Sequence, residues 1–180
     1  RHVCPGATAV PEPCSAGGYC PEQYPTAAPC AAGRWTNRTD LASADECEVC
    51  PAGAACRVGS TEPQACPAGK VAPSNGTTAC EACVPGKYQD EEQRTSCKEC
   101  DAGTYCDEGA LVEKWCPAGT FNPQPGGQNE TACRNCTVGK YCPLGASAAQ
   151  TCTNEECGQN LYQQGECTPT TDGYTCHACD

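Results

Sequence analysis

The sequence predicts a small disulfide-rich fold, mainly β or irregular, in which short β-hairpin modules form an elongated tandem array with little helix. Three observations support this prediction. The chain has 22 cysteines in 180 residues, it has few large aliphatic side chains, and a Cys-x-x-Gly segment that usually carries an aromatic ring two residues later recurs eight times.

The scarcity of aliphatic side chains excludes an ordinary hydrophobic core. Leu, Ile, Val and Phe together account for 13 of the 180 residues, and the net charge is -11. Ordering each residue costs about 1–2 kcal/mol of backbone entropy, which so little apolar surface does not offset. A disulfide that closes a short loop contributes about 2–3 kcal/mol. Ten such bonds would replace the missing core.

The cysteine density also indicates the compartment, because disulfides persist in oxidising surroundings. We therefore expect a secreted protein or the outer part of a surface protein. Four N-x-[ST] sequons support this expectation and predict N-linked glycans, at Asn37, Asn75, Asn129 and Asn135. No apolar run approaches the roughly 18 residues of a membrane span, so none is expected in this segment. The acidic balance argues against nucleic acid as a partner.

The repeat consists of eight segments, here called modules 1 to 8, that begin with Cys and carry Gly three residues later. They begin at Cys14, Cys30, Cys50, Cys66, Cys83, Cys100, Cys116 and Cys136. An aromatic ring usually follows the Gly by two residues, at Tyr19, Trp35, Tyr88, Tyr105, Phe121 and Tyr141. The fixed Gly predicts a turn that needs positive φ or close backbone approach, and the ring is expected to cover a neighbouring disulfide.

Short modules, which read C-x5-C, alternate with long ones whose second Cys comes 14 to 17 residues after the first, except that one additional long module, Cys83 to Cys97, stands alone. A polar return loop completes each module, and Asn37, Asn75 and Asn129 fall in such loops. Each module is expected to contact only its neighbours, as in a solenoid. The predicted organisation is the end of a preceding repeat (1–13), repeat 1 (14–49), repeat 2 (50–82), a half repeat (83–99), repeat 3 (100–135), a half repeat (136–151) and a divergent cysteine-rich C-terminal part (152–180).

The repeat favours pairing of neighbouring cysteines, although sequence alone does not decide connectivity. The pairs expected are Cys14–Cys20, Cys30–Cys47, Cys50–Cys56, Cys66–Cys80, Cys83–Cys97, Cys100–Cys106, Cys116–Cys133, Cys136–Cys142, Cys152–Cys157 and Cys167–Cys176. Cys4 and Cys179 are left over, and their partners are expected outside this segment. The main alternative is interlocked pairing, for example Cys47–Cys56 with Cys50–Cys66.

Metal binding is the first chemical alternative. Cys80, Cys83, Cys97 and Cys100 have the C-x2-C-x13-C-x2-C spacing of a zinc site. Zinc would leave the C-x5-C modules unexplained, so disulfides are favoured and neither a metal nor another cofactor is expected. The acidic run Asp90-Glu91-Glu92 is interpreted as a solvated loop tip, with weak calcium binding as its alternative.

Catalysis is not expected. The two histidines, His2 and His177, lie at the extremities, and no nucleophile-elbow, zinc-protease or phosphate-loop motif occurs. The repeated rings are interpreted mostly as packing, whereas Tyr162 and Tyr174, outside the repeat register, are expected to be available for contact.

The CPAGTF segment from Cys116, with the C-x2-C step between Cys133 and Cys136, resembles the ephrin-receptor-like cysteine-rich repeats of eukaryotic surface proteins. It is also similar to the smaller modules of tumour necrosis factor receptor repeats, to protist surface antigens and to fibrous proteins of flagellar hairs. The resemblance covers about residues 14–152 and implies short β-hairpins in an elongated array. Because such repeats serve as stalks, receptor arms and filament subunits, the resemblance names no binding residue.

The function expected from these observations is structural and non-catalytic. The chain would be a glycosylated segment of an extracellular stalk, coat or self-assembling filament, with its own kind or other extracellular proteins as partners. The alternatives are the ligand-binding ectodomain of a cell-surface receptor and a protist surface antigen.

Overall fold

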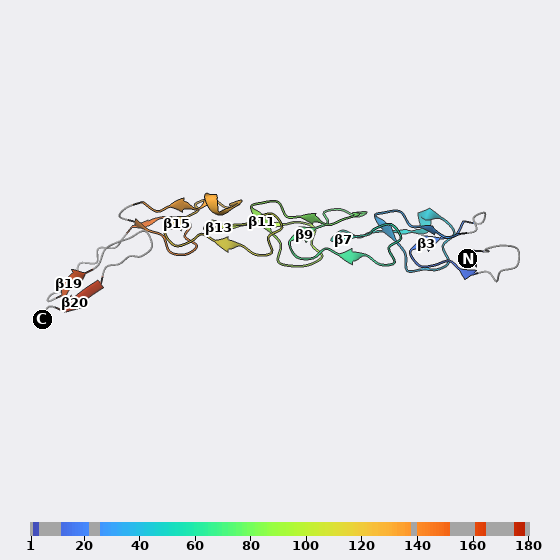
Figure 1. Ribbon diagram of the computed structural model, residues 1–180, viewed down its shortest axis with the longest axis horizontal. Coiled ribbons are helices and arrows are strands. Elements are labelled where there is room, and N and C mark those ends of the chain that lie inside the picture. Colours follow the sequence, from blue (N-terminus) through green and yellow to red (C-terminus); the bar gives the residue numbers. More distant parts are fainter. Residues whose placement is uncertain are drawn as a thin grey trace. The chain divides into compact units, whose positions relative to one another are not determined.

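The computed structural model describes residues 2–3, 12–21, 26–137, 140–151, 161–164 and 175–178. In these residues the chain forms two-stranded antiparallel hairpins joined by irregular loops (Figure 1). The hairpin strands are β1 His2–Val3 with β2 Glu12–Pro13, β3 Gly18–Tyr19 with β4 Ala28–Pro29, β5 Arg34–Trp35 with β6 Glu48–Val49, β7 Ala54–Ala55 with β8 Gln64–Ala65, β9 Lys70–Val71 with β10 Glu81–Ala82, β11 Lys87–Tyr88 with β12 Lys98–Glu99, β13 Thr104–Tyr105 with β14 Lys114–Trp115, β15 Thr120–Phe121 with β16 Arg134–Asn135, β17 Lys140–Tyr141 with β18 Gln150–Thr151, and β19 Leu161–Gln164 with β20 Thr175–Ala178.

The helical content of the described residues is two 3₁₀ turns, η1 Ala44–Glu46 and η2 Glu130–Ala132. The fold class expected from the sequence, a disulfide-rich tandem array of short hairpins with little helix, is therefore confirmed. Contacts divide the chain into two compact bodies. The first comprises Arg1–Cys83 and Gln89–Cys97, and the second comprises Val84–Tyr88 and Lys98–Asp180.

In the part of the chain that the structure describes, eight disulfides cross-link the modules, and each joins neighbouring cysteines. The bonds are Cys14–Cys20, Cys30–Cys47, Cys50–Cys56, Cys66–Cys80, Cys83–Cys97, Cys100–Cys106, Cys116–Cys133 and Cys136–Cys142. These are eight of the ten expected pairs, and they are incompatible with the interlocked alternative. The proposed pairs Cys152–Cys157 and Cys167–Cys176, and the leftover Cys4 and Cys179, involve residues outside the described part of the chain.

Each module opens with a tight turn built on its Cys-x-x-Gly sequence. The residue after the Gly donates its N–H to the carbonyl of the residue after the Cys, as Arg34 does to Ala31 at 3.0 Å. In modules 1 to 7 the Gly occupies the third position of this turn with positive φ, for example 81° at Gly33. A side chain is disfavoured in that conformation, and this accounts for the invariant Gly.

Backbone hydrogen bonds join each module to the next at all seven junctions between modules 1 and 8. The turn Gly donates its N–H to the carbonyl of the residue after the ring position of the next module, at 2.7–2.9 Å. The Gly carbonyl accepts from the first Cys of that module, at 2.8–3.1 Å. Gly33 shows both bonds, to Cys56 and from Cys50. Because these bonds use only the main chain, the junction repeats despite changes in side chains.

The expectation that each module contacts only its immediate neighbours is wrong. A Cβ placed on Gly33 of module 2 would lie 2.3 Å from the carbonyl oxygen of Gly76, in the return loop of module 4. Four other turn glycines stand equally close to a return loop two modules on, with hypothetical Cβ-to-oxygen distances of 2.2–2.6 Å. In these five cases the return loop extends back past the preceding module to the one before it.

A second set of residues with positive φ, here called the second glycine row, lies in these return loops. Its members are Gly59, Gly76, Gln93, Gly109, Gly126 and Gly145. Five of the six donate their N–H to the first Cys of the preceding module at 2.7–2.9 Å: Gly59 to Cys30, Gly76 to Cys50, Gln93 to Cys66, Gly126 to Cys100 and Gly145 to Cys116. Gln93 is the one described non-glycine residue with positive φ, at 58°.

The buried interior of the described residues consists mainly of cystine sulfur and the rings that cover it. Tyr19 packs on the cluster of Cys30, Leu41 and Cys47. Trp35 and Phe121 likewise pack on clusters that contain the Cys50–Cys56 and Cys136–Cys142 bonds. The prediction that rings cover neighbouring disulfides is confirmed at these three positions. Leu41 is fully buried, whereas Leu111 and Leu144 are exposed.

In a short module the second Cys directly follows the ring position. In a long module a different buried residue stands in that place. These residues are Thr36, Ala72, Gln89 and Asn122, each no more than 3% exposed. In three of them the side-chain oxygen accepts the N–H two residues later, from Arg38, Glu91 and Gln124. The polar side chain thus organises the start of the longer loop where a short module uses a disulfide.

Candidate interaction surface

The four sequons all place an exposed Asn on the described surface, but their surroundings differ. Asn37 lies in the return loop of module 2, and Asn135 lies on β16 opposite Thr120. Asn75 accepts a hydrogen bond from the N–H of Ala52 in module 3, at 2.8 Å. Asn129 is the N-cap of η2 and accepts from both the N–H and the hydroxyl of Thr131. Each sequon is therefore at the surface, and glycan attachment itself stays a prediction.

Two exposed apolar side chains of the second body lie at one return loop. Trp115 on β14 is 61% exposed, and Leu144 in module 8 is also 61% exposed. Gly145 follows Leu144 and lies under the Trp115 ring, because a Cβ on Gly145 would come within 2.3 Å of ring atom Cε3. Leu111 and Val112, in the loop of module 6, are exposed as well. Trp115 and Leu144 together form what is here called the Trp115–Leu144 patch.

Lysine side chains lie over two of the repeated rings. The ammonium of Lys98 stands 5.8 Å from the centre of the Tyr88 ring, and that of Lys114 stands 5.9 Å from the Tyr105 ring. In both hairpins the lysine is the direct cross-strand partner of the ring. The Lys114 ammonium also pairs with Asp107, and this hydrogen bond raises the pKa of Lys114 above its ordinary value. Each of these two rings therefore has a lysine ammonium close to it.

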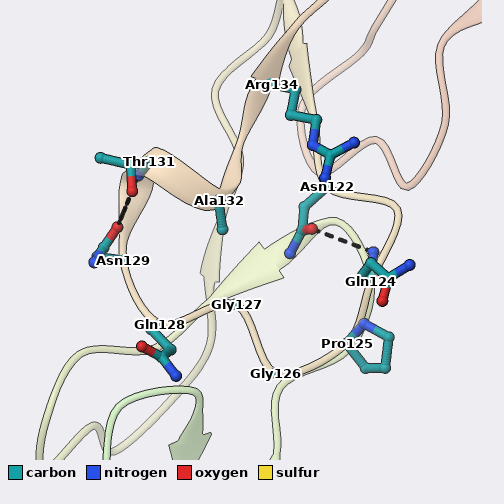
Figure 2. Close-up of a pocket in the computed structure, with 10 residues that line it drawn as sticks. All are labelled: Asn122, Gln124, Pro125, Gly126, Gly127, Gln128, Asn129, Thr131, Ala132 and Arg134. Carbon is teal, nitrogen blue, oxygen red and sulfur yellow. Dashed lines mark hydrogen bonds between the residues drawn. The ribbon is translucent and has the colours of Figure 1, made fainter.

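A shallow cup of about 380 Å³ lies in the loop of module 7, with Arg134 of β16 at its edge (Figure 2). Its buried member, Asn122, donates its amide to the carbonyl of Thr104 at 2.9 Å and accepts from the N–H of Gln124. Besides Pro125 and Ala132, the rest of the lining consists of carboxamides, a guanidinium, glycines and a threonine hydroxyl. Such groups donate and accept hydrogen bonds, but the lining contains no carboxylate or imidazole to act as a base.

Comparison with known proteins gives no family. No protein-family model and no curated protein matches this chain. Within the described ranges, neither 3₁₀ turn nor any other helix has the length and apolarity needed to cross a membrane.

The cysteines with zinc-site spacing are divided among three different disulfides. Cys80 pairs with Cys66, Cys83 with Cys97, and Cys100 with Cys106. No thiolate remains at these positions to bind a metal. Across the described part of the chain, no three His, Cys, Asp or Glu side chains converge as metal ligands.

The acidic run of module 5 lies on an exposed loop, where Glu91 forms an ion pair of 2.9 Å with Arg94. His2 and His177 fall on β1 and β20, and Tyr162 on β19. Their side chains, and the whole of Tyr174, lie outside what the structure describes.

The sequence interpretation missed the second glycine row, although its signal is present. The loop position comes nine residues after the first Cys of a short module and ten after that of a long one, as in Cys50 to Gly59 and Cys66 to Gly76. It also missed the buried residue that follows the ring, and the exposure of Trp115. No sequence pattern indicates that Trp115 is exposed, because it directly precedes Cys116 and is not one of the repeated ring positions.

Proposed function

We propose that this chain is a non-catalytic, glycosylated segment of an extracellular stalk, coat or filament that associates with further copies along its length. The observation that carries the proposal is the repeated junction, in which main-chain groups of each module bond to the next module at all seven positions. A junction that does not depend on side chains can be repeated without limit, as a structural array requires.

The surface chemistry supports a contact role rather than a reaction. The cup in module 7 offers amides and a guanidinium, and the acidic loop of module 5 is solvated. The density of disulfides supports an oxidising, extracellular setting. The resemblance to ephrin-receptor-like repeats, which serve as stalks and filament subunits among other roles, is consistent with this proposal.

The Trp115–Leu144 patch is the surface through which we expect copies to associate. An exposed Trp beside an exposed Leu resembles the aromatic anchors that dominate protein interfaces. A contact between this patch and a different surface of the next copy would be heterologous and would propagate into a fibre.

The proposal is tested by sedimentation velocity on the glycosylated chain over a wide concentration range. We expect concentration-dependent species larger than a monomer, and we expect Trp115→Ser with Leu144→Ser to return the chain to monomers. The matched control is Val58→Ser, an equally exposed apolar residue in the first body. A chain that stays monomeric at every concentration contradicts self-association.

The same patch favours one other function, that of a ligand-binding ectodomain. In that case the double variant would lose a soluble protein partner while the free chain stays monomeric throughout. Sedimentation of the chain alone separates the two functions, because only the structural proposal predicts larger species without a partner.

A further inference from the structure

In the sequon of module 4 the Asn side chain is exposed, and the sequon is nevertheless hydrogen-bonded to module 3. The carbonyl oxygen of the Asn75 amide accepts the N–H of Ala52 at 2.8 Å. The hydroxyl of Thr77, the other residue that defines the sequon, donates to the carbonyl of Ser74 at 2.7 Å. Both recognition side chains are therefore already engaged within the fold.

The backbone of the same tripeptide is also occupied. Gly76 donates its N–H to Cys50 at 2.8 Å, and the carbonyl of Thr77 accepts from Cys56 at 3.0 Å. The carbonyl oxygen of Gly76 is packed so closely on Gly33 that a Cβ there would lie 2.3 Å away. Three modules thus hold one tripeptide, and the Cys66–Cys80 disulfide closes the loop that carries it.

The sequon of module 2 is a natural control. Asn37 and Thr39 are exposed, and in the part of the chain that the structure describes neither side chain forms a hydrogen bond. Arg38 donates its N–H to Thr36 and its guanidinium to Asp40, and both contacts are local to the loop. No other module engages the side chains of this tripeptide.

We propose that Asn75 is a glycosylation site that accepts its glycan only before module 4 docks on module 3, whereas Asn37 remains an acceptor in the folded chain. The inference rests on the proposed extracellular glycoprotein. A transferase must hold the Asn and Thr side chains and surround the tripeptide backbone. At Asn75 the fold already uses these groups and covers the backbone, so docking closes the site.

The transfer itself uses a lipid-pyrophosphate-linked oligosaccharide as donor. A bond forms between Nδ2 of Asn75 and the anomeric carbon of the sugar, the bond from that carbon to the pyrophosphate oxygen breaks, and one amide proton is released. The bond to Ala52 uses the carbonyl oxygen of the Asn75 side chain and not its nitrogen. A chain modified early therefore keeps this bond and still completes its fold.

The inference is tested by incubating the disulfide-intact, unglycosylated chain with purified oligosaccharyltransferase and a lipid-linked oligosaccharide, followed by mass spectrometry of each sequon. Because several hydrogen bonds must open together, we expect transfer to Asn75 about tenfold or more slower than to Asn37. After reduction and alkylation the two rates should become similar. Equal rates in the native chain overturn the inference.

A second experiment tests the same competition during synthesis. The chain is expressed in secretory cells as wild type and as Cys66→Ser with Cys80→Ser, and occupancy is measured in the cell-associated pool so that misfolded chains are counted. We expect occupancy at Asn75 to rise in the variant while that at Asn37 is unchanged. If occupancy at Asn75 is below full in the wild type and does not change in the variant, the proposed timing is overturned, whereas the proposed function is not. If neither Asn is ever modified, the glycoprotein part of the proposed function fails, and this inference fails with it.

Discussion

Replacing Gly33 with Ala should separate modules 2 and 4, and the same change at Gly76 should not. The two glycines face each other and have similar φ values, 81° and 76°. An added Cβ on Gly33 meets the Gly76 carbonyl at 2.3 Å, whereas the nearest atom to a Cβ on Gly76 is 3.7 Å away. The pair thus distinguishes the cost of the backbone conformation from the cost of lost contact.

The magnitudes follow from the local bonds. Ala in the left-handed region costs about 1–2 kcal/mol, and both variants carry this cost. In Gly33→Ala the backbone must also shift, and the bonds of Gly33 to Cys56 and from Cys50 weaken. At about 0.5–1.5 kcal/mol for each bond, the total becomes about 2–5 kcal/mol. Gly76→Ala should cost only about 1–2 kcal/mol.

Urea unfolding with the disulfides intact measures this difference. Trp35 follows Gly33 closely and packs on the Cys50–Cys56 cluster, so its fluorescence reports the junction. A Trp115→Phe background removes the exposed second Trp. Equal losses of unfolding free energy in the two variants would refute the close-packed junction.

Three further outcomes are expected. Gln93→Gly should raise the unfolding free energy by up to about 1 kcal/mol, because Gly adopts the positive φ of this position without strain. Gln93→Ala should give no such gain. A lower urea midpoint for the Gly variant than for the Ala variant would count against the second glycine row. Asn122→Ala should lower the unfolding free energy by about 1–3 kcal/mol, because both the nitrogen and the oxygen of its buried amide form hydrogen bonds. The exposed Asn135→Ala should cost less than about 0.5 kcal/mol. Similar losses for the two variants in thermal unfolding would contradict this expectation. Acid should destabilise the chain little, because every carboxylate from Asp40 to Glu130 is exposed or half-buried. A hydrogen bond from Arg38 lowers the pKa of Asp40, so this small exposed contribution is present at neutral pH and lost only as the pH falls through that lowered value. Urea midpoints that drop between about pH 7 and pH 5 would contradict this last expectation.

The covalent framework could be predicted from the sequence because its signals are local and fixed in spacing. Cys50 and Cys56 are six residues apart in a repeated pattern, and the turn glycine stands three residues after each first Cys. The ring at Trp35 also lay in register, so its position over a disulfide could be inferred.

The contacts that span two modules could not be predicted in the same way. The approach of Gly33 to Gly76 depends on how far a loop extends back across the module between them, and loop length in residues does not give that path. The exposure of Trp115 depends on the neighbouring loop at Gly145. Both features arise from packing between distant residues, and the candidate interaction surface consists of such features.

The most direct test of the account is amide hydrogen exchange at the turn glycines of the junctions, in the native chain, with a chelator, and after reduction and alkylation. If disulfides hold the hairpins in place so that the junction bonds form, the protection of Gly33 and its counterparts is unchanged by the chelator and is lost on reduction. Protection that survives reduction, or that the chelator abolishes, would contradict the central claim.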